Sequence, residues 1–388
     1  MIGRSTRYTV SEVHVYTRSQ SDSAVRGRKS AVTEMTAVRT WGPRDYRVEA
    51  VPVPEPGPNE VQIQIGACGI CASDMKCYLG GPLFWGSNGA GGYVEPPCIA
   101  GHEFAGRVVA MGPGAAEKHG LSIGDRIVAE QIVPCNECRY CLSGHYWMCM
   151  RHIIFGFKEQ LSGGMASYAI LPENALLHRV PESLSEEEAA YIEPAACAWH
   201  AVDRGEIKAG DVVVICGVGN IGLCMLQIAR MRNPGMVIAL DAKPDRLAIA
   251  SQLGADQSIH VLEEDAVAIV RDLTGGYGCD VFIEASGNPA AIDSGLQMIR
   301  KLGTFVEFSV FNEPATINWT VIGDTKELNI HGSHLGPNCY PQTIAALADG
   351  SLDVKPLLAK SWPIGQFEQA MNAALSGAAL KQFILPTV

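Results

Sequence analysis

One stretch of the sequence decides the fold: Val212-Val-Val-Ile-Cys216-Gly217-Val-Gly219-Asn220-Ile221-Gly222. Its mostly β-branched start predicts a buried strand, and the residues from Ile221 onward predict a helix. The glycines between them have the spacing G-x-G-x-x-G. Here Gly217 permits a tight turn, Gly219 lets the backbone approach a pyrophosphate, and Gly222 lets the helix pack on the strand. The free N–H groups at the helix start, on Asn220 and Ile221, predict a dinucleotide-binding loop. A flavin site, or a turn that binds nothing, is the alternative.

Strand-like and helix-like segments alternate around this loop, from Asp211 to His334. The expected strands are residues 212–216, 236–241, 257–260, 281–285, 304–309 and 328–331. The expected helices are residues 221–232, 245–253 and 290–302. Such alternation is typical of an α/β fold with a doubly wound parallel sheet.

Asp241 ends the second of these strands and lies about 20 residues after the last glycine, where such a site places an acid on the adenosine ribose. A carboxylate there accepts from both ribose hydroxyls and repels a 2′-phosphate, which favours NAD over NADP. Arg246 is close in sequence and belongs to the same predicted site. Its positive charge would instead favour binding of the 2′-phosphate of NADP.

The size and charge of the chain narrow the classes of function. With 388 residues, two domains are expected. A formal net charge of −11 argues against nucleic-acid binding. No apolar stretch reaches the roughly 18 residues that suggest a membrane span. The basic, Ser-rich residues 1–34 are expected to be a flexible N-terminal extension.

The region from Met35 to about Pro172 predicts a β-rich domain. Residues 61–65, 106–111 and 126–130 alternate or concentrate apolar side chains as strands do, and prolines and glycines punctuate them. Farther along, Ser185 followed by three glutamates predicts a helix start.

Cysteines cluster in this β-rich region. Of 13 in the chain, Cys135, Cys138, Cys141 and Cys149 have the spacing C-x₂-C-x₂-C-x₇-C. Four thiolates fill a tetrahedral coordination sphere, so the pattern predicts a structural zinc site. An iron–sulfur cluster and disulfides are the alternatives. Clustered, odd-numbered cysteines favour a reducing, cytoplasmic location over secretion.

Two further patches complete a family pattern: Gly69-Ile-Cys71-Ala-Ser73-Asp74 and Gly101-His102-Glu103-Phe-Ala-Gly106. Together with Gly124-Asp-Arg-Ile-Val128, the cysteine cluster, Glu193-Pro194 and the glycine loop, they appear in the order of the zinc-containing medium-chain dehydrogenases. From about Met35 to the C-terminus, the chain resembles this family.

The resemblance implies a fold and a set of functional residues. The fold would be a GroES-like catalytic domain over residues 35–195, completed by residues 340–388, with a Rossmann domain over residues 196–339. Cys71 and His102 would bind a catalytic zinc, and Ser73 would relay the substrate proton. Glu193 stands where simple-alcohol members have cysteine, as in the polyol branch. Either Glu103 or Glu193 would be the third ligand, the other acting nearby. Lys76 replaces a relay histidine of many members, which leaves the outer proton route open.

These features together predict a cytoplasmic enzyme with two zinc ions per chain that transfers hydride from a secondary alcohol of a small polyol to NAD. Overall resemblance favours erythritol or threitol. A threonine 3-dehydrogenase-like enzyme, a 2,3-butanediol dehydrogenase and a non-catalytic or zinc-free quinone-reductase-like family member are the alternatives. The family commonly forms homodimers or homotetramers, which sets the expected assembly. The aromatic loop from Tyr78 to Tyr93 is expected either to shape the substrate pocket or to form a surface contact.

Overall fold

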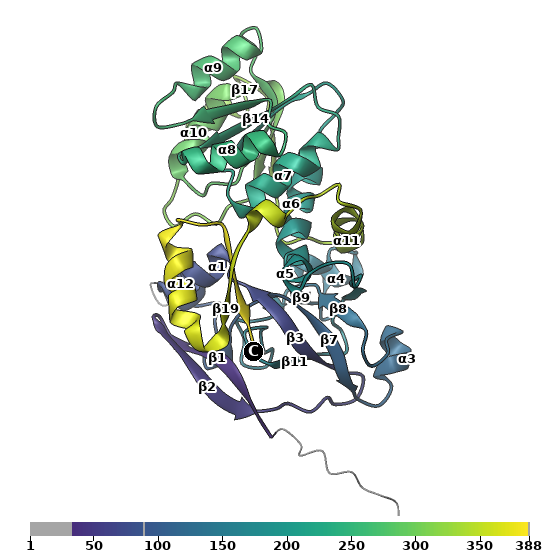
Figure 1. The fold of residues 1–388 in the computed structure, drawn as a ribbon. Coiled ribbons are helices and arrows are strands. Elements are labelled where there is room, and N and C mark those ends of the chain that lie inside the picture. The colour runs from purple at the N-terminus through teal and green to yellow at the C-terminus, as the bar shows by residue number, and fades with distance from the viewer. Residues whose placement is uncertain (1–32, 88–89, 387–388) are drawn as a thin grey trace, which may run out of the picture. The chain divides into compact units, whose positions relative to one another are not determined.

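The computed structural model describes residues 33–87 and 90–386. The extension predicted to be flexible lies outside these residues as far as position 32, and the first strand begins at Glu34. The chain from there on forms one compact unit. It contains two large sheets (Figure 1). No helix among the described residues is long and apolar enough to cross a membrane.

The first large sheet has six parallel strands in the order β15-β14-β13-β16-β17-β18. The strands are β13 (Val212–Cys216), β14 (Met236–Asp241), β15 (Gln257–His260), β16 (Cys279–Glu284), β17 (Ile299–Glu307) and β18 (Asn329–Gly332). The first strand in sequence lies in the middle, so the order reverses beside it. This is the doubly wound dinucleotide-binding arrangement, and it confirms the predicted fold class.

The helices between these strands are α7 (Asn220–Arg230), α8 (Pro244–Gln252), α9 (Ala266–Leu273) and α10 (Pro289–Met298). The predicted helix over residues 290–302 was wrong at its end, because β17 begins at Ile299. Ile299 pairs with Cys279 of β16, so sheet pairing overrides the local helical pattern. The sequence did not identify α9.

The second large sheet has the order β12-β8-β7-β3-β20-β19, with β11 also paired to β3. Its strands are β3 (Val61–Gly69), β7 (Glu103–Met111), β8 (Arg126–Ala129), β11 (Tyr168–Leu171), β12 (Leu177–Arg179), β19 (Leu358–Pro363) and β20 (Lys381–Leu385). Smaller sheets join β1 (Glu34–Gly42), β2 (Asp45–Pro52) and β6 (Cys98–Ile99), β9 (Ile132–Val133) with β10 (Ile153–Ile154), and β4 (Gly86–Ser87) with β5 (Ala90–Gly91).

The end of the chain returns to this second sheet. β20 pairs with β3, with Phe383 opposite Gly69 and Ile384 opposite Cys68. Figure 1 shows these yellow C-terminal strands beside the purple-blue β3. Two helices precede β20: α11 (Tyr340–Asp349) and α12 (Phe367–Ser376). The first and last parts of the sequence therefore share one sheet.

The remaining helices lie mostly in the first half of the chain. They are α1 (Ala72–Tyr78), α2 (Pro82–Trp85), α3 (Ala115–His119), α4 (Arg139–Leu142), α5 (Glu186–Ala190) and α6 (Ile192–Arg204). Helix α5 begins as predicted, because the Ser185 hydroxyl accepts from the Glu188 N–H at 3.1 Å and the Glu188 carboxylate accepts from the Ser185 N–H. Such a capping box satisfies two N–H groups that a helix start leaves unpaired.

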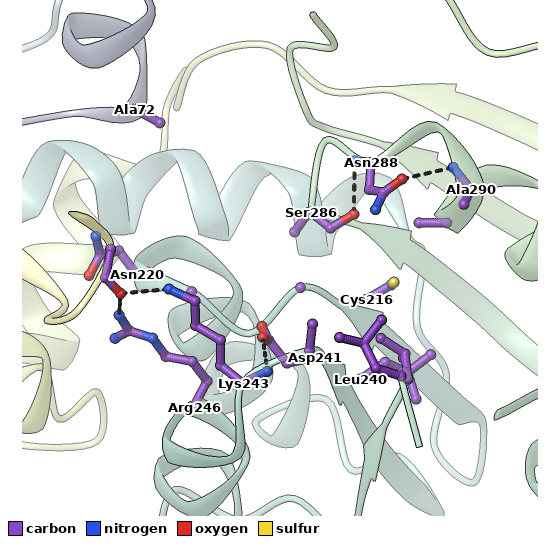
Figure 2. Close-up of a pocket in the computed structure, with 18 of the residues that line it drawn as sticks. Ala72, Cys216, Asn220, Leu240, Asp241, Lys243, Arg246, Ser286, Asn288 and Ala290 are labelled. Carbon is purple, nitrogen blue, oxygen red and sulfur yellow. Dashed lines mark hydrogen bonds between the residues drawn. The ribbon is translucent and has the colours of Figure 1, made fainter. Parts of the chain in front are cut away.

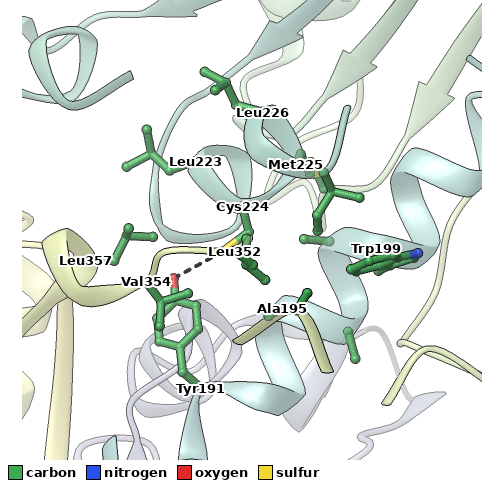
Figure 3. Close-up of a cluster of buried hydrophobic side chains, with 14 of the residues drawn as sticks. Tyr191, Ala195, Trp199, Leu223, Cys224, Met225, Leu226, Leu352, Val354 and Leu357 are labelled. Atoms are coloured by element: carbon green, nitrogen blue, oxygen red, sulfur yellow. Dashed lines mark hydrogen bonds between the residues drawn. The ribbon is translucent and has the colours of Figure 1, made fainter. Parts of the chain in front are cut away.

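A buried cluster fixes α6 against α7. Tyr191, Ala195 and Trp199 pack with leucines and Met225 of α7 (Figure 3). The Tyr191 hydroxyl also donates to the Asn220 carbonyl at 2.9 Å. Each fully buried large apolar side chain contributes about 1.5–3 kcal/mol. This packing sets the position of Glu193, which lies in the first turn of α6, relative to the glycine loop that starts α7.

Candidate metal centres and nucleotide cleft

Cys71, His102 and Glu103 lie close together at the edge of the second sheet where β3 ends and β7 begins. Each offers one donor atom, and these atoms lie within 4.8 Å of one another. The pairing of β3 with β7 explains the meeting, because Gly69 lies opposite Glu103 and Cys71 follows two residues later. A soft thiolate, an imidazole and a carboxylate are zinc donors, and three protein ligands leave a fourth position open.

Two polar side chains lie beside the ring nitrogens of His102. Asp74 Oδ1 lies 3.7 Å from His102 Nδ1, and Asp74 Oδ2 accepts from the Cys71 N–H at 2.9 Å. Ser73 Oγ lies 3.3 Å from His102 Nε2. A carboxylate behind a histidine is the usual support for a metal ligand. The sequence analysis predicted a role for Ser73 at this site but none for Asp74.

The Glu103 carboxylate is the strongest sign that this group binds something. It is fully buried, and among the described residues its Oε1 has no hydrogen-bond partner, while its Oε2 faces only the Lys381 amine. Buried polar atoms normally do have one. Lys381 of β20 forms a buried ion pair with Glu103. Burial disfavours the charged amine, but the nearby anions outweigh it and raise the pKa of Lys381. The residues present therefore fit a metal cation.

Glu193 lies near this group but has other partners. Its Oε1 accepts from Gln131 Nε2 and, at 3.4 Å, from the Cys197 thiol, and Tyr340 donates to Gln131 Oε1 at 3.0 Å. Burial raises the pKa of Glu193 to about 7, while His102 opposes the rise. The structure thus groups Glu103, rather than Glu193, with Cys71 and His102. No motif indicated Gln131 or Tyr340.

Lys76 lies one turn along α1 from Cys71. Its amine donates to the carbonyl of Val310, in the segment after β17. Burial lowers the pKa of this half-buried lysine. Lys76 therefore joins α1 to the edge of the parallel sheet where the strands end.

The second candidate metal centre is the predicted cysteine cluster. Cys135, Cys138, Cys141 and Cys149 bring their sulfur atoms within 4.8 Å of one another, and all four are free thiols. Hydrogen bonds from the backbone at Cys141 and Met150 lower the pKa of Cys138 to about 6, which favours the thiolate that binds metal. The cluster fits one tetrahedral zinc ion.

A cavity of about 790 Å³ opens at the glycine loop. Gly217, Gly219, Asn220, Asp241 and Arg246 line it, and Figure 2 labels the last three. The positive φ of +95° at Gly217 suits glycine, and a Cβ at Gly222 would lie 2.0 Å from the Gly217 carbonyl oxygen. A Cβ at Gly219 would meet nothing within 4 Å, so the loop faces open space there. Ile221 follows in α7 and does not line the cavity.

Polar groups hold the acid at the end of β14. The Asp241 carboxylate accepts from the N–H groups of Val218 and Lys243, both at 2.9 Å. Lys243 Nζ and Arg246 Nη2 both donate to the carbonyl of Gly377, at 2.6 and 3.1 Å. Because Gly377 ends α12, these cations face a carbonyl at the negative end of a helix.

Two family models match the chain: the alcohol dehydrogenase GroES-like domain over residues 57–182 and the zinc-binding dehydrogenase over residues 220–349. An erythritol/L-threitol dehydrogenase of Mycolicibacterium smegmatis is 44% identical over 354 residues, which cover 91% of this chain and 98% of that protein. The chain belongs to the zinc-containing medium-chain dehydrogenases. A sorbitol dehydrogenase of Bacillus subtilis is 34% identical, covering 91% of this chain and 97% of its own length.

Solved structures of this family agree with the fold. A putative zinc-binding dehydrogenase of Sinorhizobium meliloti, bound to NADP, superposes with a TM-score of 0.82 at 28% identity, over 91% of this chain and 99% of that one. This medium-chain dehydrogenase is therefore an oxidoreductase of a family that uses zinc and a nicotinamide dinucleotide.

Proposed function

We propose that this medium-chain dehydrogenase oxidises a secondary hydroxyl of a small polyol to a ketone with NAD, and that its preferred substrates are tetritols such as erythritol and threitol. The observation that carries the proposal is the second buried carboxylate, Glu193, beside Cys71, His102 and Glu103. A glutamate at this position is typical of the polyol branch. The 44% identity to an erythritol/L-threitol dehydrogenase supports the tetritol preference.

Cys71, His102 and Glu103 would hold the catalytic zinc, and Asp74 would orient His102. When bound, zinc acts as a Lewis acid that lowers the pKa of a hydroxyl, and the nicotinamide accepts hydride. Lys381 keeps a positive charge against Glu103, which limits how far that carboxylate can turn. Gln131 holds Glu193 in place beside the group.

Ser73 is placed to receive the substrate proton, since its hydroxyl lies 3.3 Å from His102 and thus at the edge of the metal group. Lys76 does not continue this path, because its amine donates to Val310. The proton therefore leaves from Ser73 by another route, which would start at solvent in the cleft. This departs from members with a histidine relay.

Asp241 gives the preference for NAD. Backbone N–H groups fix its carboxylate, which would accept from the ribose hydroxyls and repel a 2′-phosphate. Arg246 does not offset this preference, because its guanidinium is buried and bonded to Gly377. Gly217, Gly219, Gly222 and the start of α7 at Asn220 and Ile221 would bind the pyrophosphate.

The structural zinc, the domain division, the location and the assembly complete the proposal. Cys135, Cys138, Cys141 and Cys149 would bind the structural zinc. Residues 35–195 with 340–388 would form the catalytic domain, and residues 196–339 the nucleotide domain. The enzyme would act in the cytoplasm as a homodimer or homotetramer.

A threonine 3-dehydrogenase activity is less favoured by the structure. A bound threonine needs a cation for its carboxylate. Two lysines at the metal group are engaged: Lys381 with Glu103 and Lys76 with Val310. Neither is left to bind an amino acid.

Steady-state rates with erythritol, L-threitol, sorbitol, butane-2,3-diol and L-threonine test the proposal, with NADH formation as the readout. We expect the highest kcat/KM with a tetritol and NAD. Turnover of threonine without turnover of any polyol would overturn it.

A further inference from the structure

The side chains of Tyr93, His152 and His334 form a polar wall, and Phe157 lies between this wall and the His102 ring of the candidate catalytic zinc group. Together with Phe157, their rings form a continuous chain of ring contacts that starts at His102. The His102 ring lies 5.3 Å from Phe157, Phe157 lies 5.3 Å from Tyr93, and Tyr93 lies 5.3 Å from His152. His152 then meets His334, with 2.9 Å between their Nε2 atoms.

The segment that carries His334 is held against the catalytic helix. A Cβ at Gly336 would lie 2.6 Å from the backbone of Ala196, so this segment touches α6 within one turn of Glu193. A few residues on, Tyr340 donates to Gln131, which itself donates to Glu193. Because His334 also follows β18, it lies beyond the carboxyl ends of the parallel strands, where such sheets bind ligands.

The hydrogen-bonding capacity of this wall is not used up within the protein. The Tyr93 hydroxyl is buried and has no hydrogen-bond partner among the described residues. Most buried hydroxyls are bonded, so an orphan that lies two ring contacts from His102 points to a ligand. The short contact between His152 and His334 requires one Nε2 to donate and the other to accept. Each imidazole therefore presents a defined donor or acceptor to its surroundings.

We propose that Tyr93, His152 and His334 form the subsite that recognises the hydroxyl groups of the polyol that are not oxidised. This inference rests on the proposed polyol activity. A hydroxyl both donates and accepts, which matches an orphan phenol beside two imidazoles whose Nε2 contact makes one Nδ1 a donor and the other an acceptor. A site built to bond a hydroxyl discriminates strongly against an analogue that lacks it, because its polar groups are then left unpaired.

The matched substrates are meso-erythritol and meso-butane-2,3-diol, which is erythritol without its two terminal hydroxyls. The variants are His334→Leu, which removes the imidazole, and Tyr93→Phe, which removes only the hydroxyl. His145→Leu is the control, because His145 is exposed and bonds to Ser143 away from the wall. Melting temperature and zinc content show whether each variant is folded and loaded.

We expect His334→Leu and Tyr93→Phe to lower the ratio of kcat/KM for erythritol to that for butanediol by about 5- to 100-fold, the cost of unpaired buried polar groups. The loss should fall mainly on KM for erythritol. His145→Leu should leave the ratio unchanged, and His334→Gln should retain more of it than His334→Leu.

Two results would overturn the subsite while the proposed function stands: an unchanged ratio in both variants, or an equal loss with both substrates, which would indicate a contact that only holds the fold together. A wild-type enzyme that oxidises erythritol and butane-2,3-diol equally well would do the same. If the wild-type enzyme oxidises no polyol, the proposed function falls and the subsite falls with it.

Discussion

Lys381, near the end of the chain, forms a buried ion pair with Glu103, one of the three candidate ligands of the catalytic zinc. Both side chains are almost wholly inaccessible, with 2% and 0% exposure. The return of β20 to β3 makes this contact possible, so the C-terminal strand contributes to the site as well as to the sheet.

Replacing Lys381 by Met should destabilise the protein by about 3–5 kcal/mol, because it leaves a buried carboxylate without its cation. Denaturant unfolding of the apo and zinc-loaded forms measures the effect. Added zinc should recover part of the loss, since a bound cation would also neutralise Glu103. Lys381→Arg, which keeps the charge, is the control. Equal free energies of unfolding for the Met variant and the wild type would show that the ion pair does not stabilise the fold.

Removing the charge of Glu103 and removing that of Glu193 should have different effects on zinc content and on kcat. Glu103→Gln should lower the zinc content from two ions to one per chain, because Glu103 lies with Cys71 and His102. Glu193→Gln should keep both ions and lower kcat, because Glu193 is held by Gln131 outside the ligand group. Metal analysis of both variants decides between them, and the reverse outcome would make Glu193 the ligand.

The two candidate zinc sites should also separate by their mutants. Cys71→Ser should abolish activity with little change in melting temperature. Cys138→Ser should lower the melting temperature or prevent assembly, because structural zinc contributes to folding free energy. Thermal melts and zinc analysis of both proteins provide the comparison. If both variants lose only activity and melt as the wild type does, the division into catalytic and structural sites is wrong.

The cysteine cluster should show a defined order of reactivity once zinc is removed. The pKa of Cys138 is lowered to about 6 by backbone N–H groups, whereas burial raises the pKa of Cys141 to about 12. At pH 7, Cys138 is therefore mainly thiolate and Cys141 mainly thiol. After chelation, brief alkylation should label Cys138 first, and its rate should fall as the pH drops below about 6. Faster labelling of Cys141 would contradict this picture.

Asp241 should control the choice of dinucleotide. Asp241→Asn keeps the shape and removes the charge that repels a 2′-phosphate, so kcat/KM with NADP should rise relative to that with NAD, by about 10-fold or more. The ratio of the two values for wild type and variant is the measurement. A wild-type preference for NADP would refute the role given to Asp241.

Local sequence signals predicted much of the fold. β13, β14 and β15 have the predicted bounds because β-branched and apolar runs there end at loops or polar residues. The boundary between α10 and β17 was missed because nothing in Met298 to Lys301 breaks a helix locally. Only the pairing of Ile299 with Cys279 shows that this segment is a strand.

The site residues that belong to sequence motifs could be predicted. Those that only long-range contacts of the fold bring to the site could not. Cys71 and His102 belong to recognisable patterns, and the spacing of the cysteine cluster predicts a metal by itself. Lys381, Gln131 and His334 belong to no motif. Lys381 reaches Glu103 through the return of β20, and Gln131 reaches Glu193 from the position just before β9. The packing of Gly336 on α6 positions His334 of the proposed subsite. Long-range contacts of this kind leave no pattern in one sequence.

The most direct test of zinc-dependent polyol oxidation is the rate of NADH formation from erythritol and L-threitol, measured on the same protein before chelation, after chelation and after zinc is restored. We expect turnover that is lost with the metal and returns with it. Full turnover by protein shown to contain no zinc, or no turnover of either tetritol by protein that carries two zinc ions, would contradict it.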